Sequence, residues 1–325
     1  MNGSIEKHEI IDSLNILLSF NVIGSMQYRN RYNGFVGELD FQEWFKLHKP
    51  GNKVFSGGFF LPSDGGASPL KSPIYFTVSK DDVSSYVEIY KAISKLDCKR
   101  LFFIQWREGI PFSEWEKKDI MGISKPLPIP DFEVYIFDLS TYQFTPSSLD
   151  ALLDLYTDCR WIPRDQVDKP LKEFFSNELD RFDEQFILDL YVQRLIFDGF
   201  IGFKKIRGIP SDIDVIIKSE NTDLFVFLEV KEKDLSKRPP KGFGMDVERI
   251  AFFYDLMKTV GLDAFYIVRQ INNQKDRAFI DWRIVPMKKF IDKVGGNIIE
   301  GGTGMRSASS FNPTKICPEI YFSRF

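Results

Sequence analysis

Two carboxylates and one amine are expected to meet at the end of a β-hairpin in the second half of the chain. Asp214 begins one apolar run, and Glu229 and Lys231 end a second run across a short polar segment. That pattern is typical of an antiparallel hairpin. If Ser219 faces Leu224 at the turn, Asp214 faces Glu229, and strand alternation puts Glu229 and Lys231 on one face. Charges at the end of a buried strand are costly without a partner or a metal ion, so the hairpin is a candidate chemical site.

The scarcity of histidine and cysteine removes several other mechanisms. The two histidines, His8 and His48, both lie near the N-terminus. The chain therefore has too few histidines for a histidine-metal nuclease, an HExxH protease or a catalytic triad with a downstream histidine. The 3 cysteines have no metal-ligand spacing and argue against a disulfide framework or a zinc site. Carboxylates remain as the credible metal ligands.

Composition indicates an ordinary globular protein of two domains. The chain has 325 residues, of which 43% are hydrophobic and 27% charged. Its net charge of −3 gives no overall cationic field toward nucleic acid, although a local basic groove remains compatible with DNA binding. The N-terminus is polar and no apolar run reaches membrane-spanning length. We therefore expect a cytoplasmic protein with no membrane partner.

Strands alternate with helices along both halves, which predicts an α/β fold with a mixed sheet. Prolines and charges cluster near residue 165, so residues 1–165 and 166–325 are the predicted domains. Residues 28–32 combine basic and aromatic side chains, and a solvated loop is predicted there. Further predicted elements are helices at 9–20, 37–46 and 178–197, and a strand at 201–206.

An internal duplication is a further hypothesis. Both halves share the order helix, strand, strand, helix, strand, strand. Aligning Asp82 with Asp246 carries residues 101–104 onto 265–268 without a gap. The first half would then be a copy without the chemical residues, in which Gly66, Thr77 and Ser79 replace Asp214, Glu229 and Lys231; chance similarity between two α/β domains is the alternative.

The arrangement Asp214, then Glu229-Val230-Lys231, after a helix that carries Glu184, resembles the PD-(D/E)XK superfamily of nucleases and type II restriction endonucleases. The resemblance covers about residues 177–290. It implies a mixed central sheet flanked by helices, and two such domains if the first half is a degenerate copy. It also implies a Mg²⁺-dependent endonuclease that hydrolyses DNA phosphodiester bonds, with Glu184 completing the site. A solvated helix carboxylate is the other interpretation of Glu184.

These residue types suit the chemistry that the resemblance implies. Mg²⁺ prefers hard oxygen ligands, so Asp214, Glu229 and the Val230 carbonyl are the predicted metal ligands, and Mn²⁺ is expected to substitute. The metal polarises the phosphoryl group and lowers the pKa of a bound water. Lys231 would orient that water and stabilise charge on phosphorus. Asp212 competes with Asp214 for the first-ligand role, and we favour Asp214 because it enters the apolar run and faces Glu229.

Double-stranded DNA is the expected partner, and a homodimer is plausible because cutting both strands needs two sites. A basic, proline-containing excursion follows the hairpin and could clamp phosphates, although such runs are often merely solvated. A repair, recombination or transposition nuclease with the same site is the nearest alternative. A non-catalytic DNA-binding or interaction protein, in which the three charges form an ion pair, is the other. The predicted DNA contacts are Lys233, Lys237, Arg238, Lys241 and Arg306.

Overall fold

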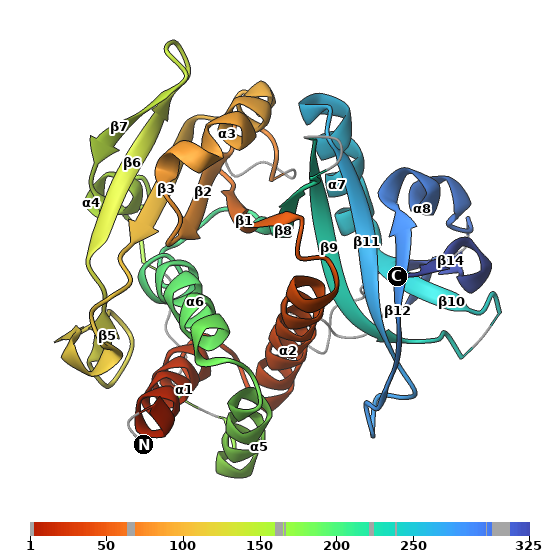
Figure 1. The fold of residues 1–325 in the computed structure, drawn as a ribbon, viewed down its shortest axis with the longest axis horizontal. Helices are drawn as coiled ribbons and strands as arrows, with labels where there is room; N and C mark the ends of the chain where they lie inside the picture. Colours follow the sequence, from red (N-terminus) through yellow and green to blue (C-terminus); the bar gives the residue numbers. More distant parts are fainter. Residues whose placement is uncertain are drawn as a thin grey trace.

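One mixed sheet of ten strands runs through the part of the chain that the computed structural model describes, with helices on both faces (Figure 1). The described residues are 3–63, 69–159, 165, 167–220, 224–237, 239–296, 298–300 and 313–325. The predicted α/β class with a large mixed sheet is confirmed. In spatial order the strands are β15 (Ser323–Arg324), β12 (Phe279–Pro286), β11 (Asp263–Ile271), β9 (Phe225–Asp234), β8 (Ser211–Lys218), β1 (Lys53–Leu61), β2 (Ile74–Ser79), β3 (Arg100–Trp106), β6 (Phe132–Asp138) and β7 (Gln143–Ser147).

Two small sheets and eight α-helices complete the described architecture. A short π-helical turn, Leu195–Phe200, continues α6. No helix of the described residues is long and apolar enough to cross a membrane. The small sheets are β10 (Gly242–Asp246), β14 (Pro313–Pro318) and β13 (Ile299–Glu300), and β4 (Glu116–Lys118) with β5 (Leu127–Ile129); the helices are α1 (Gly3–Ser19), α2 (Ser25–His48), α3 (Val87–Ile93), α4 (Leu149–Leu153), α5 (Lys169–Asp180), α6 (Glu184–Arg194), α7 (Val247–Val260) and α8 (Met287–Lys293).

The two halves of the large sheet repeat the same strand order and direction. β1 and β2 are antiparallel, β2 and β3 parallel, and β3 and β6 antiparallel. β8, β9, β11 and β12 repeat these three relations in the same order. The halves join through the antiparallel pair β1 and β8, so the sheet is continuous across the predicted boundary near residue 165. A different strand order would have ended the duplication hypothesis, which therefore stays a prediction.

Strand register changes two details of that comparison. Thr77 pairs with Phe103, and Glu229 pairs with Tyr266, so Phe103 corresponds to Tyr266 rather than to the neighbouring residue that the gapless alignment gave. Gly66 lies outside the described residues. One step beyond the pairing of Phe59 with Phe76, Gly58 lies opposite Thr77. Gly58 is therefore the position that matches Asp214.

Each half contributes the helix that covers the strands of the other half. Phe41 and Phe45 of α2 pack in one cluster with Val215 and Leu228 of β8 and β9. On the other side of the same face, α6 and its π-helical turn pack against the strands of the first half, where Phe197 stacks on Phe59 with ring centroids 4.5 Å apart. Figure 1 shows the two helices side by side below the sheet, α2 beneath β9 and α6 beneath β2 and β3. A helix from the N-terminal half therefore overlies the candidate hairpin.

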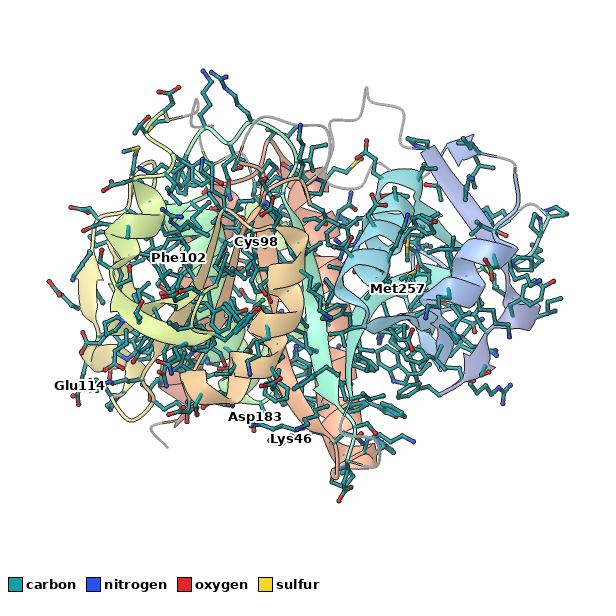
Figure 2. The ribbon with its side chains drawn as sticks, turned by 90° about the horizontal axis from the view of Figure 1, so that it is seen from above. Lys46, Cys98, Phe102, Glu114, Asp183 and Met257 are labelled. Atoms are coloured by element: carbon teal, nitrogen blue, oxygen red, sulfur yellow. The ribbon has the colours of Figure 1, made fainter. Side chains whose placement is uncertain are left out.

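The opposite face of the sheet is covered by α3 and α7, whose aromatic and aliphatic side chains form one core. Tyr90 of α3 and Phe253 of α7 are completely buried in it. The Lys95 amine, just after α3, donates a hydrogen bond of 3.0 Å to the Val260 carbonyl at the end of α7. Phe102 and Met257 lie in the interior, and Lys46 and Asp183 lie at the periphery (Figure 2).

Three local predictions were wrong. Residues 28–32 belong to α2 rather than to a loop, and Tyr28 and Tyr32 are buried because α1, α2 and α5 pack around them. The predicted helix 178–197 is two helices, because Asp183 accepts a hydrogen bond of 2.9 Å from the Gln185 amide and starts α6 anew. Residues 201–206 form turns and one bridge, between Cys159 and Lys204.

Gly57 is expected to be essential to the junction of the two halves. A Cβ at this position would lie 1.7 Å from the Ile213 carbonyl oxygen of the neighbouring strand. Gly57→Ala should therefore lower the free energy of unfolding by about 1–3 kcal/mol. Gly34→Ala is the matched control: its Cβ meets nothing closer than 3.9 Å inside α2, so stability should rise by about 0.5–1 kcal/mol. Urea unfolding measures both, and equal effects would contradict the account.

Candidate active site

The β8–β9 hairpin has the predicted register. Lys218 pairs with Phe225 and Val215 pairs with Leu228. The Ser219 amide donates to the Leu224 carbonyl across the turn at 3.1 Å. One step beyond these pairs, Asp214 lies opposite Glu229, as the sequence predicted.

Lys231 lies between the two carboxylates. Its amine is 3.1 Å from Asp214 Oδ2 and 3.1 Å from Glu229 Oε1. The backbone amide of Val230 also donates to Asp214 Oδ2, at 2.7 Å. The carboxylate side chains are 2% and 1% exposed, whereas the Lys231 side chain is 35% exposed. The structure therefore brings together all three predicted residues, and Lys231 is the most exposed of them.

Arg249, on the first turn of α7, is a fourth member of this cluster. Its Nε donates to Glu229 Oε1 at 2.9 Å and its Nη2 donates to Glu229 Oε2, a bidentate arrangement. Nη1 donates to the Ser211 hydroxyl at 2.6 Å. Nη2 also lies 3.1 Å from Asp212 Oδ1. Sequence reasoning missed Arg249, because nothing in the spacing of a helix reveals which strand its first turn contacts.

The two competing aspartates have different environments. Asp212 pairs with Arg249, and its side chain is 39% exposed. Burial opposes the charge of Asp212, but the nearby Arg249 and Lys231 lower its pKa. Asp214 is buried against Lys231, with Arg249 only at 4.0 Å. The residue that faces Glu229 and the amine is therefore Asp214, the one that the sequence argument favoured.

Burial and crowding shift the other pKa values at the site. Burial raises the pKa of Asp214 well above its usual value, and the charge of Glu229 raises it further. Burial alone would lower the pKa of Lys231, but the charges of Asp214 and Glu229 raise it well above the usual range. The two carboxylates therefore favour the protonated form of the Lys231 amine.

The acidic residue that a helix adds to this site is Glu38 of α2, not Glu184. Burial raises the pKa of Glu38 to about 7, and the charges of Lys231, Asp212 and Glu229 also act on it. Glu184 lies in the first turn of α6, where burial raises its pKa and the charges that act on it are those of Glu6, Lys7 and Asp183. The family resemblance implied Glu184, which lies on the helix before the hairpin, and a solvated helix carboxylate was the other interpretation. The sequence pattern does not reveal that α2 crosses over to the second half of the sheet.

The donor set suits a hard divalent cation, although its oxygens are engaged by basic side chains. Four carboxylates, from Glu38, Asp212, Asp214 and Glu229, gather where burial and mutual repulsion favour added positive charge. Val230, the third predicted ligand, lies in the ladder opposite Ile267. Among the described residues no group of three or more histidine, cysteine or acidic side chains is spaced to hold a metal ion. Binding Mg²⁺ through Asp214, Glu229 and the Val230 carbonyl would require Lys231 and Arg249 to yield carboxylate oxygens.

The predicted DNA contacts are spread over several environments. Lys233 continues β9 and is half-buried, and burial lowers its pKa. Lys237 and Lys241 are exposed, and the Lys241 amine donates to the Ser236 and Lys237 carbonyls at 3.1 and 3.0 Å. Arg238 and Arg306 lie outside the described residues. Lys237 and Lys241 are thus the described candidates that solvent, and a phosphate, can reach.

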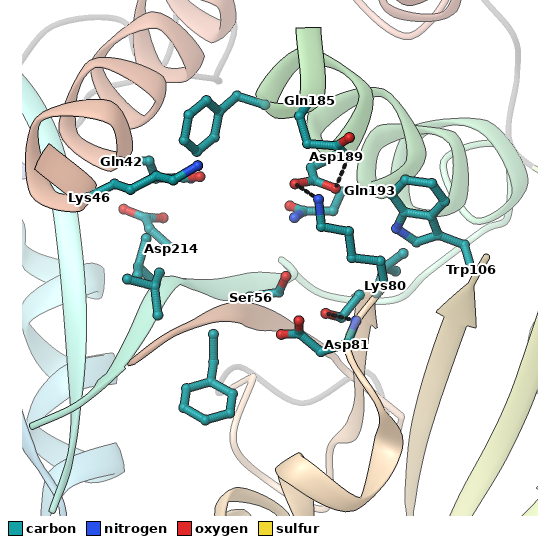
Figure 3. A pocket seen from close by; sticks show the side chains of 16 residues that line it. Gln42, Lys46, Ser56, Lys80, Asp81, Trp106, Gln185, Asp189, Gln193 and Asp214 are labelled. Carbon is teal, nitrogen blue, oxygen red and sulfur yellow. Dashed lines mark hydrogen bonds and ion pairs between the residues drawn. The ribbon is translucent and has the colours of Figure 1, made fainter. Parts of the chain in front are cut away.

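A pocket of about 210 Å³ lies beside Asp214, between α2 and α6. Its floor comes from β1, the end of β2 and β8, and its walls carry polar side chains from both helices (Figure 3). Lys80, which follows β2, is 2.6 Å from Glu108 and 3.4 Å from Asp189 of α6. Asp189 thus faces the first half of the sheet as Glu38 faces the second.

Replacing Asp189 should change how stability depends on pH. Burial raises the pKa of Asp189 from 3.8 to about 6, against the opposing charge of Lys80. A raised pKa means that the folded chain holds this proton more tightly than the unfolded chain, so its contribution to stability is lost as pH rises through about 6. Between pH 4.5 and 7.5 the wild type should lose about 1–2 kcal/mol relative to Asp189→Asn. Urea unfolding at both pH values measures this difference, and a variant of the exposed Asp131 is the control. An equal change in the free energy of unfolding for wild type and Asp189→Asn would contradict the prediction.

Comparisons with family models, with curated proteins and with solved structures found no match to this chain.

Proposed function

We propose that the chain is a Mg²⁺-dependent endonuclease that hydrolyses DNA phosphodiester bonds, most like a type II restriction endonuclease with a restriction-endonuclease-like sheet. The observation that carries the proposal is the Lys231 amine, 3.1 Å from both Asp214 and Glu229 at the end of a buried hairpin. A cation held there by two buried carboxylates is expensive to build for stability alone. It also reproduces the residue types and order of the PD-(D/E)XK motif.

The residues divide the work by their charge and exposure. Asp214, Glu229 and the Val230 carbonyl would hold Mg²⁺, which when bound would polarise the phosphoryl group and acidify a water. Lys231, partly exposed and paired with both carboxylates, would donate hydrogen bonds to the phosphoryl oxygens as negative charge develops on them. Glu38 would add a further carboxylate to the site from α2. Arg249, which holds both Glu229 oxygens in this structure, would yield one of them to the metal ion and orient the carboxylate through the other.

A non-catalytic nucleic-acid-binding or interaction protein is the second candidate. The bidentate bond from Arg249 to Glu229 favours it, because an arginine that saturates a carboxylate competes with a metal ion for the same oxygens. In that case the charged side chains of Asp214, Glu229, Lys231 and Arg249 form a structural ion-pair cluster. Double-stranded DNA would remain a partner, but no strand would be cut.

Digestion of a long unmethylated DNA by the purified chain, followed by sequencing of the ends, tests the proposal. Discrete fragments with shared end sequences in the presence of Mg²⁺ are the result expected of a restriction enzyme, and Mn²⁺ should support the same pattern. Smears or nicks at unusual DNA structures would favour a repair, recombination or transposition nuclease. Binding without any cleavage in either metal would favour the second candidate. Because cutting both strands needs two such sites, we also expect a homodimer on DNA.

A further inference from the structure

The pocket between α2 and α6 has the size of a small planar group. Pockets for drug-sized ligands span about 300–1,000 Å³, and this one is about 210 Å³. Figure 3 shows Gln42 and Lys46 on one wall, Gln185, Asp189 and Gln193 on the other, and Asp214 at the edge. Asp214 therefore belongs both to the ion cluster and to the lining of the pocket, so an occupant would lie next to the proposed scissile phosphate.

Three neutral amides, from Gln42, Gln185 and Gln193, belong to the polar lining. Gln42 projects from α2, and Gln185 and Gln193 project from one side of α6. The Gln185 amide donates to Asp189 at 3.4 Å. Within the described part of the chain, the side chains of Gln42 and Gln193 have no hydrogen-bond partner. Each such amide offers two donor hydrogens and an acceptor oxygen, the complement of the edge of a nucleobase.

The charges of the pocket argue against a phosphate as its occupant. Asp81, Asp189 and Asp214 outnumber Lys46 and Lys80 in the lining. Lys80 is also already paired with Glu108 and Asp189. The excess of acidic side chains would repel a dianionic group. A neutral polar ring carries no charge for them to repel.

The aromatic side chains of Phe186 and Trp106 also line the pocket. Phe186 of α6 is half-buried in the lining, and the Lys46 amine lies 5.4 Å from the centre of its ring. Trp106, 2% exposed, closes the side next to Lys80 (Figure 3). Bases that have left a nucleic-acid stack are typically held by aromatic faces together with hydrogen bonds to their edges.

Building on the proposed nuclease function, we propose that this pocket holds one unpaired nucleobase of the substrate, next to the phosphate that is cut. A base inside a duplex is stacked and cannot enter the pocket. The nucleotide must therefore leave the stack, at a cost of a few kcal/mol that is smallest for single-stranded or mismatched DNA. The substrate class is then DNA with an unpaired nucleotide at the cleavage position, or a duplex in which the protein flips that nucleotide out.

Saturation-transfer NMR on the full chain tests the pocket directly. The probes are the four deoxynucleoside 5′-monophosphates, with deoxyribose 5-phosphate as the probe that lacks a base. We expect at least one nucleotide to show saturation transfer at its base protons, and the sugar phosphate to show little. Gln193→Leu, which keeps the side-chain volume and removes the amide, should weaken nucleotide binding at least fivefold. Gln143→Leu, on the exposed strand β7, should leave it unchanged.

The outcomes separate this inference from the proposed function. Equal signals from nucleotides and deoxyribose 5-phosphate, no nucleotide signal, or full binding by Gln193→Leu would each overturn the pocket assignment. Base binding without DNA cleavage would support the pocket while the nuclease proposal fails, and cleavage without base binding would do the reverse.

Discussion

Lys231→Ala is expected to lower the rate of Mg²⁺-dependent DNA cleavage by about 10²–10³-fold or more. The amine is a donor held between two buried carboxylates on a partly exposed side chain, so alanine removes the charge that would meet the developing phosphoryl charge. It also leaves Asp214 and Glu229 facing each other without their shared cation. The measurement is the initial rate of plasmid cleavage at saturating Mg²⁺, with circular dichroism to establish that each variant is folded.

Two further variants keep this prediction interpretable. Asp214→Asn retains the shape of the side chain and removes a buried charge, so it should fold and should also lose cleavage. Lys99→Ala removes an exposed lysine just before β3 and should cleave at the wild-type rate. Full cleavage by a folded Lys231→Ala or Asp214→Asn protein would overturn the site assignment.

Arg249→Gln is expected to reduce the free energy of unfolding by about 3–5 kcal/mol. The guanidinium makes two hydrogen bonds to the buried Glu229 carboxylate and one to Ser211, and its loss leaves Glu229 with Lys231 as its remaining cation. Urea unfolding of Arg249→Gln, Glu229→Gln and the double variant should reveal a coupling of more than about 1 kcal/mol, because the second change removes the charge that the first leaves unpaired.

A surface pair provides the matched control for that experiment. Arg324 Nε lies 3.0 Å from Asp281, but its side chain is 78% exposed. Arg324→Gln should therefore change stability by less than about 1 kcal/mol. Additive effects of the Arg249 and Glu229 variants, or an Arg249→Gln effect as small as that of Arg324→Gln, would show that the cluster is not the tightly coupled unit that the distances indicate.

Local patterning was enough to predict the hairpin and its register. Consecutive apolar residues on either side of a polar turn specify two paired strands, and a two-residue side-chain period then decides that Asp214 faces Glu229. The general class of the fold followed from the alternation of strands and helices. These features depend on residues close together in the chain.

The residues that sequence reasoning missed all arrive from distant elements. Glu38 reaches the site because α2 crosses from the first half to the strands of the second, where Phe41 and Phe45 pack. Arg249 reaches it because α7 begins beside Glu229. Neither placement is encoded in the spacing near the motif, whereas the family resemblance implied Glu184 on the helix before the hairpin. The continuity of the sheet through β1 and β8 was likewise invisible, because long-range antiparallel pairing leaves no local signal.

The first half shows what the same sheet positions hold when they carry no charge. Thr77 and Ser79 are buried, 0% and 4% exposed, and their hydroxyls contact the hydroxyls of Tyr75 and Tyr86 at 3.1 and 3.2 Å. Hydroxyls bonded to hydroxyls inside an aromatic core cost far less to bury than carboxylates do. The contrast between these positions and Glu229 with Lys231 is the strongest structural reason to look for chemistry in the second half.

The conversion of supercoiled plasmid to nicked or linear DNA by the purified chain tests the central claim most directly. We predict conversion with Mg²⁺, none with EDTA, and none by Lys231→Ala under the same conditions. Plasmid that stays supercoiled with Mg²⁺ while the protein is shown to bind it, or equal cleavage by wild type and Lys231→Ala, would contradict the assignment of Asp214, Glu229 and Lys231 as a nuclease site.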